Sequence, residues 1–142
     1  GALQLVRLAR WAGDRTSGER LVLVLHVGYF FMPLGFLLTG ASALWSAVPP
    51  SVGIHAWTAG AVGLMTLAVM TRASLGHTGQ PLTATRGTQF IYARAVIAAL
   101  TRMAAPFDAT TVLLHVSACA WVLAFGGFAV AYGPLLMARR KV

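Results

Sequence analysis

Four histidines are the side chains of this sequence best suited to carry chemistry. His26, His55, His77 and His115 all lie inside long apolar runs or at their ends. An ionisable group is costly inside a membrane, and by default it indicates a functional site there. Because neutral imidazole binds haem iron and copper well, the four predict ligation of a haem or a metal. The plainer alternative for each is a hydrogen bond to a hydroxyl or a backbone carbonyl of a neighbouring helix.

Spacing relates these histidines to one another and to Tyr29. His26 and Tyr29 share a helix face at i and i+3. Pro33 bends that helix and leaves the Tyr29 carbonyl without its usual donor, which predicts a pocket wall beside His26. His55 and His77 are 22 residues apart. In a regular helix they would lie within about 40° of one face and roughly 33 Å apart along the axis.

Depth in the membrane sorts the histidines into two layers. His26 and His77 lie toward the predicted cytoplasmic side, and His55 and His115 toward the outside. Each layer therefore offers one cross-helix pair that could hold a bis-histidine haem.

A soft-metal site is the other candidate. His115 and Cys119, at i and i+4, present a nitrogen and a sulfur on one helix face, a spacing at which two side chains can hold copper. No third ligand is identifiable, and the alternative is a small buried cysteine.

Two arginines, Arg94 and Arg102, also lie within one of the apolar runs. Arg94, about six residues inside its apolar run, either snorkels to the headgroups or pairs with an internal anion such as a haem propionate. Arg102 is more simply a snorkelling residue.

The elements that must position these residues are membrane helices. Hydrophobic residues make up 58% of the chain, charged residues 10%, and the mean hydropathy is +0.75, whereas soluble proteins are about a quarter charged. Runs at 21–45, 54–76, 88–105 and 108–137 are each near or beyond the length of about 17–25 residues that crosses a bilayer. We therefore expect one region, 1–142, that is an all-α, polytopic membrane helix bundle of about four antiparallel helices.

Small residues suggest where these helices approach closely. Ala56 with Gly60 and Ala59 with Gly63 form small-xxx-small pairs in the second run, and Gly35 and Gly40 are the corresponding residues of the first. The segment 3–11 is either the end of a preceding helix or an interfacial helix. Since the chain starts at Gly1 rather than methionine, we expect it to be a piece of a longer protein.

Basic residues set the predicted orientation. The positive-inside rule places both ends of the chain and the His77 loop in the cytoplasm. On that side lie Arg7, Arg10, Arg15, Arg20, Arg72, Arg86, Arg139, Arg140 and Lys141, with Arg94 nearby and Arg102 on the other side. Trp45 and Trp57 would then mark the outer interface, with Trp11 and Tyr132 near the inner one.

Several function classes are disfavoured. The net charge of +8 is explained by lipid headgroups and membrane orientation, so nucleic acid is not a predicted partner. Asp14, Glu19 and Asp108 are the only acidic residues and all lie at membrane edges, so hydrolytic chemistry is disfavoured. Whether the protein is an enzyme stays open, and any activity would be redox chemistry at haem or copper.

Three motifs resemble a known family. They are Leu25-His26-Val-Gly28-Tyr29, the run 55–72 that begins His-Ala-Trp-Thr-Ala-Gly, and Leu75-Gly76-His77-Thr78-Gly79-Gln80-Pro81-Leu82. Together they resemble the C-terminal portion of the NnrS family, bacterial inner-membrane proteins linked to nitric oxide and nitrosative stress and described as containing haem and copper. The third and fourth runs resemble the family more loosely. The family motif usually has arginine where this chain has Gln80.

The resemblance implies a parent protein of roughly a dozen helices whose other helices would be partners of this segment, with nitric oxide and the lipid bilayer as further partners. Its motif picks out His26, Tyr29, His55, Arg72 and His77, whereas His115 and Cys119 match nothing in it.

Our hypothesis is a protein of nitric oxide metabolism or protection that holds haem b, with copper as a further option. His26 with His77 or His55 would be axial ligands, and Arg72 and Arg94 would anchor propionates. The alternative is a secondary transporter or permease whose intramembrane histidines couple protons; a membrane assembly subunit is a third option.

Overall fold

The computed structural model describes residues 1–11 and 18–137, and within them every regular element is helical. In chain order the elements are α1 (Ala2–Arg10), α2 (Arg20–Leu44), α3 (Pro50–His55), η2 (Ala56–Val62), α4 (Gly63–His77), α5 (Arg86–Ala104), η3 (Ala105–Phe107) and α6 (Val112–Met137). Of the basic and acidic residues discussed above, Asp14, Arg15, Arg139, Arg140 and Lys141 lie outside the described residues.

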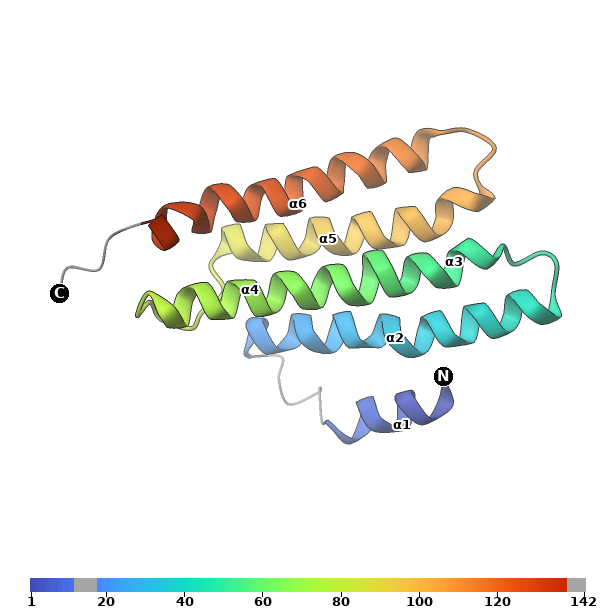
Figure 1. The fold of residues 1–142 in the computed structure, drawn as a ribbon, viewed down its shortest axis with the longest axis horizontal. Helices are drawn as coiled ribbons and strands as arrows, with labels where there is room; N and C mark the ends of the chain where they lie inside the picture. Colours follow the sequence, from blue (N-terminus) through green and yellow to red (C-terminus); the bar gives the residue numbers. More distant parts are fainter. Residues whose placement is uncertain (12–17, 138–142) are drawn as a thin grey trace.

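Four helical segments are long and apolar enough to cross a membrane, which confirms the predicted helix bundle. They are Arg20–Leu44, Pro50–His77, Arg86–Phe107 and Val112–Met137. Figure 1 shows them side by side and antiparallel, with α1 alongside α2. α2 and α5 begin, and α4 ends, at one end of the bundle, whereas α3 and α6 begin at the other.

Two span boundaries differ from those expected from hydropathy. The second span begins at Pro50, where proline fits the first turn of a helix because its missing N–H has no partner to lose. The fourth begins at Val112 instead of residue 108. There the Asp108 carboxylate accepts hydrogen bonds from the backbone N–H groups of Thr110 (2.9 Å) and Leu113 (3.2 Å), which holds a turn before the helix.

Glycines let bulky rings pack between the helices. A Cβ atom added at Gly35 would overlap the Trp57 indole, and one added at Gly60 would overlap the Phe31 ring. Trp57 therefore lies between α2 and η2, with its indole N–H donating to the Met32 carbonyl (3.1 Å), rather than simply marking the outer interface. By contrast, nothing lies within 4 Å of a Cβ at Gly40.

Hydroxyl groups join α5 to α6. The Ser117 hydroxyl donates to the Ala98 carbonyl (2.9 Å), and the hydroxyls of Thr88 and Tyr132 are 2.5 Å apart. Tyr132 is buried against Phe128, so it helps to hold this helix pair together. These two cross-helix bonds fix the position of α6, which forms one wall of the pocket described next.

Candidate functional site

His55 lies where the second span changes its helical form. It is the last residue of α3, and the seven-residue π-helix η2 begins directly after it. π-helical turns inside α-helices are rare and occur frequently at functional sites. Because η2 is wound differently from an α-helix, the regular-helix calculation that put His55 and His77 near one face does not apply to this span.

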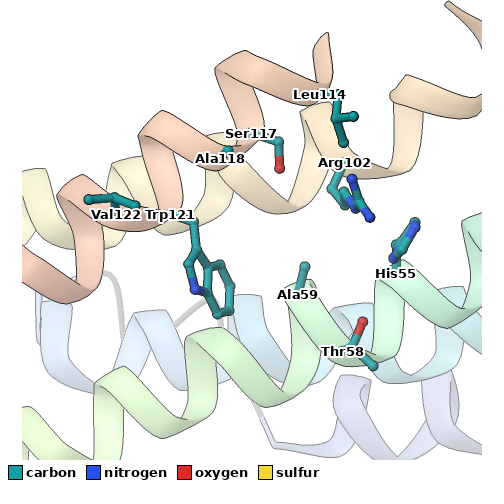
Figure 2. Close-up of a pocket in the computed structure, with 9 residues that line it drawn as sticks. All are labelled: His55, Thr58, Ala59, Arg102, Leu114, Ser117, Ala118, Trp121 and Val122. Carbon is teal, nitrogen blue, oxygen red and sulfur yellow. The ribbon is translucent and has the colours of Figure 1, made fainter. Parts of the chain in front are cut away.

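A pocket of about 500 Å³ opens beside His55, between the second span and α6. Ligand sites in proteins usually have volumes of about 300–1,000 Å³. Figure 2 shows the residues that line it: His55, Thr58 and Ala59 from the second span, Arg102 from α5, and Leu114, Ser117, Ala118, Trp121 and Val122 from α6.

His55 and Arg102 are the ionisable side chains of this pocket. Its two hydroxyl groups are engaged within the protein, because Thr58 donates to the Ile54 carbonyl (2.9 Å) and Ser117 to the Ala98 carbonyl. Both His55 and Arg102 are partly buried, and Figure 2 shows them next to each other at one end of the pocket. The same two residues also line a neighbouring pocket of about 340 Å³.

Trp121 forms the opposite end of the pocket. A Cβ atom at Gly63 would lie 2.7 Å from the Trp121 ring, so this glycine makes room for the indole against α4. Trp121 also packs against Phe125, with ring centroids 4.4 Å apart. Ala59, Leu114, Ala118 and Val122 complete the lining with aliphatic side chains, so the pocket is mostly apolar along its length and cationic where Arg102 lies beside His55.

His26 lies near the other end of the bundle, under α1. Its Nδ1 is 3.0 Å from the Val22 carbonyl, to which it can donate, and its Nε2 is buried with no hydrogen-bond partner among the described residues. Trp11 packs edge-on against its ring at 6.0 Å. Tyr29, the predicted neighbour, packs on Trp11 and donates its hydroxyl proton to Gln4 of α1. A histidine that donates one N–H to a carbonyl and keeps the other nitrogen free has the orientation common in metal ligands.

The other predicted ligands are exposed. His77 is the last residue of α4, and His115 and Cys119 lie on the exposed face of α6. Neither His115 nor Cys119 lines the two pockets beside His55. No hydrogen bond between described residues joins His26 to His77 or His55 to His115, and His115 is not part of the lining of either pocket beside His55.

The arginines are distributed differently from the prediction. Arg102, expected only to snorkel, lines the pocket with His55. Arg72 lines a separate pocket at the end of the bundle where α2 begins, and Arg94 is exposed on α5. The sequence signal that could have found Arg102 is its depth, since it shares the outer layer with His55.

The comparison with known families agrees with the resemblance. A family model described as NnrS protein matches residues 1–140. The chain belongs to the NnrS family. No curated protein and no solved structure matches it. The three NnrS-like motifs lie on α2, on the second span with its η2 segment, and on the end of α4 with the turn that follows it.

The residues that line the His55 pocket of this NnrS chain fit a haem. A b-type haem needs an axial nitrogen, apolar walls and a cation near its propionates, and the pocket offers His55, its apolar α6 lining and Arg102. Copper sites usually combine three or more nitrogen and sulfur ligands. Within residues 1–11 and 18–137, no cluster of three or more His, Cys, Asp or Glu could hold a metal ion.

Proposed function

We propose that the pocket between the second span and α6 is a haem site of a membrane protein that acts on nitric oxide or protects against nitrosative stress. His55 would be an axial ligand, and Arg102 would pair with a propionate. The single observation that carries the proposal is that a partly buried histidine and a partly buried arginine line one pocket whose other walls are mostly apolar.

Each of these residues has a separate task. The His55 nitrogen would hold the iron and fix its position against η2. The Arg102 guanidinium would neutralise an anionic edge in a region from which water is largely excluded, where such a pair is stronger than at an exposed surface. Trp121 and the aliphatic side chains would exclude water from the faces of the ring. When bound, the haem would supply an iron centre able to bind nitric oxide.

His26, near the other end of the bundle, is a second candidate ligand. Its buried Nε2, which has no hydrogen-bond partner among the described residues, supports this role. Tyr29, Arg72, His77 and Arg94 stay predictions from the family motif and from depth. A copper site at His115 and Cys119 would need ligands from beyond the described residues.

The first experiment compares optical spectra of the full-length protein and its histidine variants. We expect the purified protein from haem-replete cells to show a Soret band that shifts with nitric oxide. His55→Ala should lose most of the bound haem, because the axial nitrogen is removed. His115→Ala is the matched comparison, since it removes an imidazole from the same end of the bundle outside the pocket. The measurement is the haem-to-protein ratio.

Arg102→Gln provides a second readout in the same assay. We expect it to weaken haem binding several-fold while leaving the axial coordination signature of the spectrum unchanged. An unchanged haem-to-protein ratio in His55→Ala would remove the ligand role. A colourless, metal-free wild-type protein with pH-dependent flux in vesicles would overturn the haem proposal in favour of a transporter.

A further inference from the structure

Three adjoining pockets meet at the end of the bundle where α2 and α5 begin. All three are lined by Arg20 of α2 and Gln89 of α5. The largest, of about 480 Å³, has a polar lining that includes Glu19, Arg20 and Arg72. A second, of about 460 Å³, adds Arg86. The arginines of these two pockets make them basic, and we call the two together the basic mouth.

The third pocket is an apolar groove that leads from the basic mouth along the bundle. It has a volume of about 160 Å³ and lies between α2 and α5, where Leu23, Val24, Val27, Ala93 and Val96 line it. Since α2 and α5 are both membrane-spanning segments, the groove runs at the depth of lipid acyl chains.

The charges of the mouth favour an anion. Arg20, Arg72 and Arg86 are all exposed, and Glu19 is the one carboxylate among the residues that line the two mouth pockets. The mouth therefore carries three formal positive charges and one negative charge. The Gln89 amide is held in place by donating to the Ala84 carbonyl (3.0 Å), so it forms a fixed edge between mouth and groove.

We propose that this site binds an anionic phospholipid, with its phosphate among Arg20, Arg72 and Arg86 and an acyl chain in the groove between α2 and α5. Basic pockets between membrane helices on the cytoplasmic side recognise anionic headgroups in this way. The apolar groove selects a lipid over free phosphate, because a soluble anion would fill the mouth alone. The site is separate from the His55 pocket, and it does not depend on haem.

Native mass spectrometry of the full-length protein in detergent tests this site. The protein is mixed with equal amounts of phosphatidylglycerol and phosphatidylcholine of the same acyl chains. We expect phosphatidylglycerol to be retained several-fold more. Arg20→Gln and Arg86→Gln should each reduce its retention about fivefold, the effect expected for losing one arginine near an anionic headgroup. Arg10→Gln is the matched control, because it removes an exposed arginine of α1 that lines none of the three pockets.

A second pair of variants tests the groove and leaves the charges intact. Ala93→Leu narrows the groove, and the edge of the mouth pocket that Ala93 also lines, from an exposed position of α5, so the helix should fold normally while lipid retention falls. Ala129→Leu makes the same change on the exposed face of α6 and should retain lipid like the wild type. Equal retention of the two lipids would overturn the proposal. So would displacement of the lipid by millimolar inorganic phosphate, or unchanged retention in Ala93→Leu, because either result would indicate a phosphate site without a lipid chain.

Discussion

Asp108 shows how a single carboxylate determines where a membrane helix begins. It lies in the connection between α5 and α6, outside the membrane-spanning segments. Hydrogen bonds from the Thr110 backbone N–H, the Thr110 hydroxyl and the Leu113 N–H favour its charged form and lower its pKa. A lowered folded-state pKa means that the carboxylate stabilises the fold above its ordinary pKa of 3.8. This contribution is lost as pH falls through the lower, folded-state value.

We therefore expect Asp108→Ala to lower the melting temperature by a few degrees at pH 7 in detergent. The difference from the wild type should shrink as the pH falls below 3.8, because protonation removes the same interactions from the wild type. Asp108→Asn keeps one acceptor oxygen, so it should retain part of the stability without this pH dependence. A difference that is the same at every pH would show that the carboxylate charge has no role.

Single residues also show how far the sequence alone could go. His55 was predicted as a ligand from its type and its place in an apolar run, and the structure puts it in a pocket. Arg102 was set aside, because an arginine at a helix end usually snorkels toward the headgroups. Whether it turns inward depends on a cavity formed by α6, and helical periodicity carries no information about a neighbouring helix.

Among the elements, the interface between α2 and η2 gives the clearest test of packing. Gly35 and Gly40 looked equivalent in the sequence, but only Gly35 lies against an indole. Gly35→Ala should destabilise the protein by about 1–3 kcal/mol, as overpacking does. Gly40→Ala should be neutral or stabilising by up to about 1 kcal/mol, because alanine favours a helix. The measurement is the thermal unfolding of both variants in the same detergent. Equal effects of the two variants on stability would contradict the close packing of Trp57 against Gly35.

The π-helix η2 is the element that the sequence did not predict. Hydropathy located the second span correctly because it averages over many residues. It is insensitive to a change from α to π winding, since both forms bury apolar side chains. The segment Ala56–Val62 contains mostly small residues and Trp57, whose indole fits against Gly35 on α2. That fit depends on a partner distant in sequence, which explains why the local pattern gave no sign of it.

For the molecule as a whole, the predicted orientation in the membrane can be tested directly. We expect the turn between α4 and α5 to face the cytoplasm and the turn between α5 and α6 to face outward. Gln80→Cys and Ala109→Cys, each in a Cys119→Ala background, place single thiols in these two turns. A membrane-impermeant maleimide should label Ala109→Cys in intact spheroplasts, and Gln80→Cys only after permeabilisation. The reverse pattern would invert the topology.

The four spans bury very different shares of their surface within this chain. About half of the most apolar window of Pro50–His77 is buried, but only 22% of that of Val112–Met137. The second span is thus central, and α6 presents most of its apolar surface away from the other described helices. The number of spans could be predicted from the lengths of the apolar runs, whereas this ranking could not, because it reflects which helices pack together.

The pairing of α5 with α6 also bears on how the chain enters the membrane during synthesis. Arg86–Phe107 has the lowest hydropathy of the four spans, 1.3, and includes three arginines, whereas Val112–Met137 reaches 1.9. Arginine near the centre of a helix opposes insertion by about 2.5–3.5 kcal/mol. α5 makes its most extensive contact with α6, to which only a short connection joins it. α5 and α6 would therefore insert into the bilayer together as one helical hairpin. The favourable insertion of the more apolar α6 would offset the unfavourable insertion of α5.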